Sequence, residues 1–224
     1  ATPRPGARPF VSKWMKPAAP AHPFPQKLSD TGLFTDTPSL KPHPALIPYE
    51  VNASAWHDGA VSERYVALPG RERMEVTEQG GWNFPDGAAV VQTLTLQGRR
   101  IESRVLLRQQ NEWTGYSYAW NEAQTDALLV SAEGETRRLA SGQSWRLPGK
   151  QECMSCHSRA ANFVLGLSTV QLNRGSQIAD WEKAGVLQAS HAPVEESEWR
   201  RELGVKKRGD QALQSVLALV LPAP

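Results

Sequence analysis

The chain has 224 residues, 40% of them hydrophobic and eight of them tryptophan, which is enough to bury a core as one large β-rich domain or two small ones. Its 25 basic and 23 acidic residues are mixed along the sequence and leave a formal charge of +2, which argues against a nucleic-acid-binding protein. No apolar run approaches the roughly 20 residues that cross a bilayer, so no transmembrane segment is predicted.

Residues 1–44 are predicted to form an extended, proline-rich arm. Most of the 17 prolines precede residue 49, and proline neither donates to a β ladder nor fits a helix interior. Apolar residues between the prolines, such as Trp14, Phe24 and Phe34, favour docking on the rest of the molecule or on a partner. The alternative is a disordered leader. The first residues look like a mature end left after cleavage of an export signal.

Residues 45–150 are predicted to form an antiparallel β region, either a meander or a sandwich. Between residues 61 and 147 the apolar pattern has a period of two, with β-branched and aromatic residues divided by turn signals. A hairpin is expected around Gly98. The expected strands are 63–68, 73–77, 88–96, 100–108, 113–120, 126–131 and 135–139.

The only two cysteines, Cys153 and Cys156, are separated by two residues in a CxxC motif, and His157 follows directly. This CxxCH spacing is typical of covalent haem attachment. Two thiols a short turn apart can form thioethers with the two vinyl groups of one porphyrin, and the adjacent imidazole can ligate the iron. The motif predicts one covalent haem c with His157 as the proximal iron ligand. Because such haem is attached outside the bacterial cytoplasm, a periplasmic or extracellular location is expected.

Three other interpretations compete at the same residues. A structural zinc site needs four ligands, and the remaining histidines are scattered. A thioredoxin-like dithiol would begin a helix in a βαβ unit, whereas antiparallel strands are expected before Cys153. A disulfide between the two cysteines would close a very small ring.

Residues 151–224 are predicted to hold the haem-attachment segment and short helices, packed with residues 45–150 as one compact domain. Apolar spacings near three and four recur over 165–172, 178–187 and 211–219. Gly185 and Gly204 are expected to end helices. The predicted fold class is therefore α+β.

Several blocks occur in one order along about 150 residues: LSDTGLF (28–34), PYEVN (48–52), Trp56, DGA (58–60), WNFPDG (82–87), RIESR (100–104), GYSYAWN (115–121), QTDA (124–127), CMSCH, LGL (165–167) and QLNR (171–174). With these blocks the chain resembles a family of exported bacterial c-type haem proteins that often occur beside, or fused to, quinoprotein (PQQ) sugar dehydrogenases. The resemblance implies redox partner proteins, such as a dehydrogenase or another cytochrome. Members commonly carry a second CxxCH, which this chain lacks, so one haem is expected.

The layout of strands followed by a late CxxCH is also similar to β-sheet cytochromes of the nitric-oxide-binding cytochrome c-prime-beta type. Some proteins of that architecture cross-link a lysine to haem and oxidise hydroxylamine. No lysine lies between Lys41 and Lys150, which disfavours that chemistry here.

The residue on the other side of the iron decides between electron transfer and ligand binding. The first candidate is His57, in a polar turn before a strand, and the alternative for it is an ordinary exposed loop histidine. The second alternative is an iron that has no second ligand from the protein. His191 and Met74 are the last candidates, and Met74 is expected to pack in the core instead.

Haem propionates favour arginine, tyrosine, tryptophan or backbone donors. The aromatic series at period two is expected to face a core or to form a haem-pocket wall. The candidates on the strands are Arg104, Arg108, Tyr116, Tyr118 and Trp120.

The leading functional prediction is a periplasmic monohaem c-type cytochrome that transfers single electrons between a dehydrogenase and a downstream acceptor. It is an electron-transfer protein or a subunit of a redox complex, assembled through the N-terminal arm, rather than a stand-alone enzyme. The alternative is a five-coordinate haem protein that binds nitric oxide or reacts with peroxide.

Overall fold

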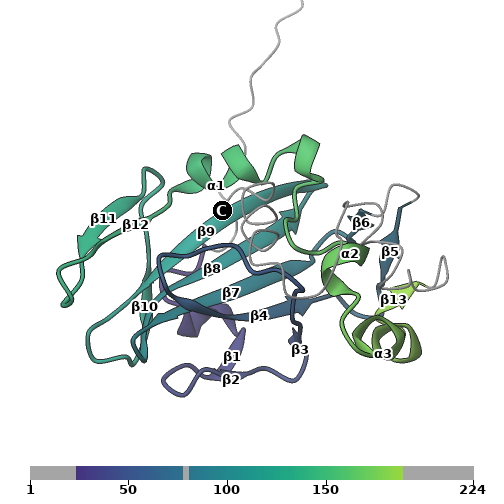
Figure 1. The fold of residues 1–224 in the computed structure, drawn as a ribbon, viewed down its shortest axis with the longest axis horizontal. Coiled ribbons are helices and arrows are strands. Elements are labelled where there is room, and N and C mark those ends of the chain that lie inside the picture. Colours follow the sequence, from purple (N-terminus) through teal and green to yellow (C-terminus); the bar gives the residue numbers. More distant parts are fainter. Residues whose placement is uncertain (1–23, 78–80, 189–224) are drawn as a thin grey trace, which may run out of the picture.

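The structure is a computed structural model that describes residues 24–77 and 81–188. Its centre is a six-stranded antiparallel sheet with the strand order β10-β9-β8-β7-β4-β3 (Figure 1). Neighbours in the sheet follow chain order, as in a meander, except that β5 and β6 intervene between β4 and β7. The prediction of an antiparallel β-rich domain is confirmed. The six strands are β3 (Ile47–Pro48), β4 (Val61–Ala67), β7 (Ala89–Leu96), β8 (Arg99–Gln109), β9 (Glu112–Trp120) and β10 (Ala127–Leu129).

Two tight hairpins fix the register of the long strands. Gln97 and Gly98 connect β7 to β8 with φ of 51° and 75°, and Gln110 and Asn111 connect β8 to β9 with φ of 54° and 61°. Two consecutive residues with positive φ make the turn whose twist matches that of the strands it joins. The hairpin expected around Gly98 is confirmed.

Smaller elements surround this sheet. Two short two-stranded sheets pair β1 with β2 and β11 with β12, and a three-stranded sheet has the order β13-β5-β6. The bounds are η1 (Ser29–Thr31), β1 (Phe34–Asp36), β2 (Lys41–Pro42), β5 (Met74–Val76), β6 (Trp82–Asn83), β11 (Glu135–Arg138), β12 (Ser144–Leu147), α1 (Lys150–Cys156), η2 (Arg159–Ala161), α2 (Thr169–Leu172), α3 (Gln177–Lys183) and β13 (Leu187–Gln188). No helix among residues 24–77 and 81–188 has the length and apolar character needed to span a membrane.

One face of the central sheet, here called the arm face, is covered by the chain that precedes β4. Leu28 and Phe34 from this segment are buried against Tyr118 and other residues of the sheet. Phe24 stacks on Tyr116 with ring centroids 3.7 Å apart. Residues 24–48 thus build part of the core and include short strands, while the rest of the proposed arm lies outside the described residues.

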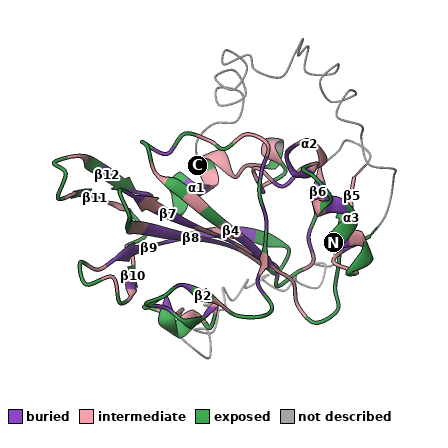
Figure 2. Ribbon diagram, turned by 60° about the horizontal axis from the view of Figure 1, so that its bottom comes forward, coloured by how far each residue is buried: buried purple, intermediate pink, exposed green. Residues whose placement is uncertain are grey.

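The opposite face, here called the helix face, carries α1 and the segments around α2 and α3 (Figure 2). Two cross-strand rows point to it because side chains alternate along a strand. One row is Val66, Val90, Leu106 and Gly115, and the other is Arg64, Gln92, Arg104 and Ser117. The first row is apolar and the second is polar, so the helix face has a polar band beside its hydrophobic core.

The chain after α3 differs from its sequence-based prediction. The helical spacing extends to position 187, but α3 ends before Gly185, whose φ is 70°. Leu187 instead belongs to β13, which pairs in parallel with β5 opposite Met74. Glycine adopts this left-handed conformation without strain, so it ends the helix as expected and redirects the chain into a strand. The helix expected over 211–219 and Gly204 lie outside the described residues.

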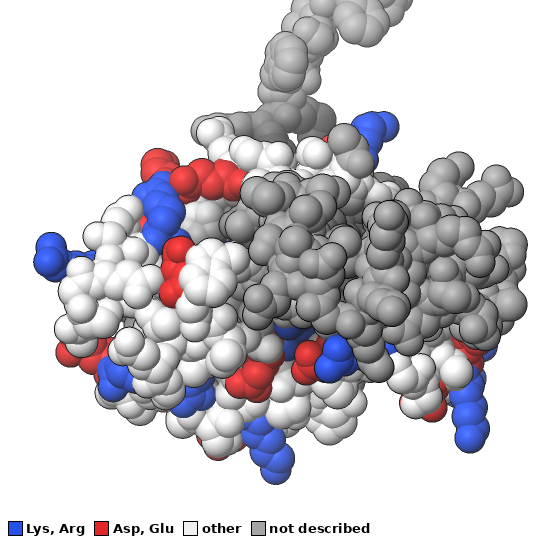
Figure 3. All heavy atoms as spheres, viewed as in Figure 1, with Lys and Arg blue, Asp and Glu red and all other residues white. Residues whose placement is uncertain are grey.

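Acidic and basic side chains occur together on the side of the molecule that Figure 3 shows. On the side shown in Figure 3, acidic and basic groups are interspersed over the described surface. This distribution gives the described part of that side no extended basic stripe of the kind that contacts phosphate backbones.

A buried ion pair lies under the polar band. Glu102 is fully buried and receives two bonds from Arg104, Nε to Oε1 at 2.9 Å and Nη2 to Oε2 at 3.0 Å. Trp145 of β12 donates its Nε1–H to Glu102 Oε2 at 3.1 Å. A buried carboxylate is stable only when its lone pairs are used in this way.

We expect Glu102→Ala to lower the free energy of unfolding by about 3–5 kcal/mol, because it leaves Arg104 as a buried charge without its partner. Glu135→Ala is the matched control: Glu135 pairs with Arg137 at the same two-residue spacing on a strand, but both side chains are about 40% exposed. That pair should contribute less than about 1 kcal/mol. Urea titrations of both variants measure the difference, and equal losses would contradict the burial argument.

Candidate functional site

The cysteine motif lies in α1, which packs against β9. Glu152 accepts the backbone N–H of Gly149 at 2.8 Å and so caps the start of the helix. Cys153 is buried against Gly115, where an added Cβ would lie 2.5 Å from the Cβ of Cys153. The absence of a side chain at Gly115 therefore allows α1 to approach the sheet this closely.

The two sulfurs differ in environment. Cys153 is buried and Cys156 is partly buried, and the two do not form a disulfide. Burial raises the pKa of the Cys153 thiol. The sulfur of Cys153 therefore lies between α1 and β9, and Cys156 is nearer the surface.

His157 ends α1 and is oriented by the backbone of the following loop. Its Nδ1 lies 2.6 Å from the carbonyl oxygen of Phe163, which has no hydrogen of its own, so Nδ1 carries the proton and donates it. This leaves Nε2 with a free lone pair, the arrangement by which histidine ligands of metals are commonly held. Burial lowers the pKa of His157, which favours the neutral ring that can act as a ligand.

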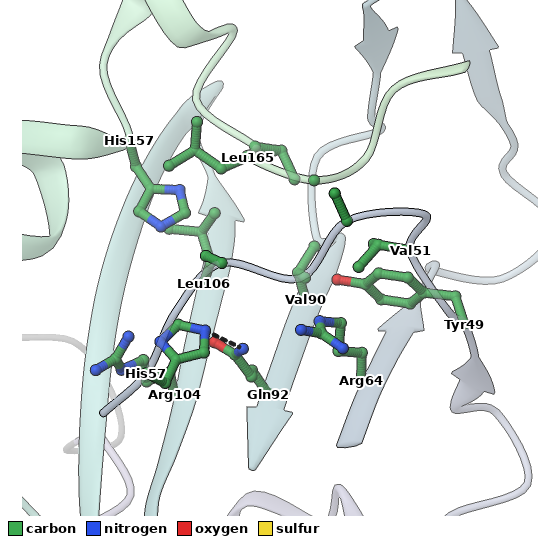
Figure 4. Close-up of a pocket in the computed structure, with 14 residues that line it drawn as sticks. Tyr49, Val51, His57, Arg64, Val90, Gln92, Arg104, Leu106, His157 and Leu165 are labelled. Carbon is green, nitrogen blue, oxygen red and sulfur yellow. Dashed lines mark hydrogen bonds between the residues drawn. The ribbon is translucent and has the colours of Figure 1, made fainter. Parts of the chain in front are cut away.

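A pocket opens between this histidine and the helix face of the sheet (Figure 4). Its cavity volume is about 110 Å³, which is below the usual range of ligand pockets. A smaller pocket of about 30 Å³ reaches Cys153 and shares three lining residues with the larger one: Arg104, Leu106 and His157. The lining of the larger pocket comprises Tyr49, Val51, Ala53, Ala55, His57, Arg64, Val90, Gln92, Arg104, Leu106, His157, Val164, Leu165 and Gly166.

His57 lines the same pocket as His157, although 100 residues separate them in the sequence. It is 8% exposed, so the alternative of an ordinary exposed loop histidine is wrong. Its Nε2 lies 3.1 Å from the amide nitrogen of Gln92, which also donates to Ser62 Oγ at 3.0 Å. An amide nitrogen only donates, so His57 Nε2 accepts and Nδ1 carries the proton.

The pocket is cationic or neutral along its polar side. Burial lowers the pKa of His57 to about 4, and the guanidinium groups of Arg104 and Arg64 add to this effect. His57 is therefore uncharged at neutral pH. Arg64 donates to Ser54 Oγ at 3.1 Å, whereas Arg104 Nη1 is buried with no hydrogen-bond partner among the described groups.

The other predicted residues separate into two groups. Arg104 lines both pockets and Tyr116 lines the smaller one. Tyr118 and Trp120 belong to the core of the arm face, as the core alternative expected, and Tyr118 donates to the carbonyl oxygen of Pro25 at 3.0 Å. Neither of them lines the two pockets. Arg108 lines neither pocket.

Of the two other candidates for the second iron ligand, the structure describes Met74 but not His191. Met74 is fully buried in the core around Trp82 and Trp181 and does not line either pocket, as expected for core packing. His191 lies outside the described residues. The described residues contain no group of three or more histidine, cysteine or acidic side chains placed to hold a metal ion.

Sequence reasoning missed three contributors to the site. Gln92 and Arg64 are pocket residues only because their strands place them next to Arg104 in one cross-strand row. Side chains alternate between the two faces along β4 and β7, so the strand register would have predicted that these residues share a face with Arg104. The carbonyl oxygen of Phe163 has no sequence signal because any residue type supplies one.

No protein-family model matches the chain, and neither a curated protein nor a solved structure shows significant similarity to it. The function must therefore be argued from the motif and from the geometry of the pocket.

The depressed pKa of His57 predicts a pH dependence of stability. The unfolded chain, with an ordinary histidine pKa of 6.5, binds more protons than the folded chain between that value and about pH 4. The contribution of His57 to stability is complete above this window and is lost as the pH falls through it. We expect His57→Gln to lose less stability than the wild type between about pH 7 and about pH 4.5 in urea titrations. The exposed His43 gives the control, His43→Gln, and equal losses in the wild type and His57→Gln would contradict the prediction.

Proposed function

We propose that this protein is a monohaem c-type cytochrome that carries single electrons between a dehydrogenase and a downstream acceptor. The observation that carries the proposal is His157, which follows the CxxC pair directly, is oriented through Nδ1 by the Phe163 carbonyl and lines a pocket on the helix face. The export that covalent haem attachment requires places the protein in the periplasm or outside the cell.

The chemistry of the residues present fits a haem, although the cavity of about 110 Å³ is smaller than the usual cofactor pocket. Cys153 and Cys156 offer two thiols on one short helix, His157 offers a neutral imidazole, and the unpartnered Nη1 of Arg104 offers a donor for an acidic group. A haem bound here would supply a one-electron couple, with iron as the redox centre.

The chain's own residues would hold the haem, orient its histidine ligand and shield the pocket from water. The Phe163 carbonyl fixes the ring of His157, and Gly115 lets α1 lie close to the sheet, where Cys153 lines the smaller pocket. Val90, Leu106 and Leu165 contribute apolar walls that exclude water from part of the pocket. A rigid, partly dry pocket keeps the reorganisation that accompanies electron transfer small.

Expression in a host that matures c-type cytochromes tests the proposal. We expect a coloured protein whose pigment stays bound in acidified organic solvent and gives the pyridine haemochrome of a thioether-linked haem. His157→Ala should lose the native reduced spectrum, whereas His43→Ala, with an exposed histidine far from the motif in sequence, should keep it. A colourless wild-type protein, or extractable pigment, would refute the assignment.

A second candidate is a haem protein with an open coordination position that binds a small molecule such as nitric oxide. The observation that favours it is the bond from the Gln92 amide to His57 Nε2, because this nitrogen is engaged and is not free to ligate iron. His57 would then be a pocket residue held beside the open position.

Carbon monoxide added to the reduced protein distinguishes the two candidates. With His57 held by Gln92, we expect an immediate Soret shift in the wild type. Gln92→Leu removes the donor and should slow or abolish the shift if the freed His57 then reaches the iron. If the wild type does not shift and His57→Ala does, His57 is the distal ligand and the electron-transfer assignment is favoured.

A further inference from the structure

Arg104 is the one arginine of the described residues that lines both pockets. Its Nε and Nη2 are used by Glu102, but its Nη1 is buried and has no partner. A buried guanidinium nitrogen without an acceptor is costly, so such groups in native proteins usually meet a ligand or an ordered water.

The surroundings of Arg104 hold the guanidinium in one orientation. Glu102, itself fully buried, grips one edge of the group with both carboxylate oxygens and is fixed in turn by Trp145. The two-point contact leaves Nη1, which is buried, as the guanidinium nitrogen without an acceptor. Figure 4 shows Arg104 next to His57, on the side of the ring away from Gln92.

The charges around the pocket favour a single negative group. Arg64 and Arg104 are both on the wall, and no aspartate or glutamate is among the lining residues of either pocket. Glu102 beneath the wall offsets one of the two guanidinium charges, which leaves one positive charge in excess. A monoanionic carboxylate matches this excess and accepts from Nη1 in the planar geometry that arginine prefers.

We propose that Arg104, held by Glu102, is the binding site for a carboxylate in this pocket. The carboxylate is either a propionate of the haem, in which case the inference rests on the proposed function, or that of a free small organic acid. Both sources present the same chemistry to Nη1, and the experiment separates them.

The first arm applies if the purified protein is coloured. The midpoint potential of the wild type is measured from about pH 5.5 to about pH 8, together with Arg104→Gln and Arg108→Gln. Arg108 is the matched control because it lies on the same face of β8, also has a buried and unpartnered nitrogen, and lines neither pocket. The wild type should show a nearly constant potential, since Arg104 keeps the carboxylate ionised throughout this range.

Arg104→Gln leaves the carboxylate partly buried without its cation, so its pKa should rise into the measured range and the potential should become pH-dependent. Arg108→Gln should follow the wild type. The other titratable groups that face the carboxylate are His57, His157, Arg64 and Tyr49 in the pocket and Glu102 below it, and all of them are the same in both variants. The difference between the two variants therefore reports on the carboxylate at Arg104.

The second arm applies if the protein is colourless, which would refute the proposed function but not this inference. Acetate and succinate are titrated into the protein by calorimetry, with thermal unfolding to check that each variant is folded. We expect the wild type and Arg108→Gln to bind one of these acids, and Arg104→Gln to bind it at least about tenfold more weakly, the effect of losing one charged hydrogen bond.

A coloured Arg104→Gln protein with the same pH profile as the wild type would overturn the inference, and so would a colourless wild type that binds neither acid. If Arg104→Gln does not fold, the measurements on the wild type alone still test the inference. A strongly pH-dependent potential in the coloured protein, or no acid binding in the colourless one, contradicts the carboxylate site.

Discussion

The buried pair of Glu102 and Arg104 is the interaction on which the organisation of the helix face depends. It stands where three parts of the chain meet: the central strand β8, the β12 strand that supplies Trp145, and the pocket lined by His57 and His157. Two opposite charges are kept out of water there because they are bonded to each other and because Glu102 also accepts from Trp145. The pair therefore serves both the packing of the sheet and the polarity of the pocket wall.

The pocket lies on the helix face because the two faces of the sheet are covered to different extents. The arm face is closed by residues 24–48, which bury aromatic and aliphatic side chains against it. The helix face is only partly closed, because α1 covers the region of β9 while the loops that contain His57 and residues 164–166 arch over β4, β7 and β8. A pocket persists where the polar row of the sheet prevents these loops from forming a continuous apolar core.

The haem hypothesis joins two features that lie far apart in sequence. The CxxCH motif provides the attachment chemistry at the end of α1, and the pocket provides space, apolar walls and cationic groups beside it. The oriented ring of His157 connects them, since it belongs to the motif and lines both pockets. An iron ligand that is both neutral and held by a backbone carbonyl is what a stable redox site requires.

The sequence by itself determined the long strands, the hairpin near Gly98 and the identity of the three motif residues, because alternation, turn chemistry and the CxxCH spacing are local properties. It also showed that Tyr116, Tyr118 and Trp120 share one face, but not that this face belongs to the arm. Only the tertiary structure decided that His57 is buried opposite His157, that Gln92 occupies its Nε2, and that Leu187 pairs with β5 instead of extending α3. These outcomes depend on which distant segments meet across the sheet, and residue spacing along the chain does not encode the positions of such contacts.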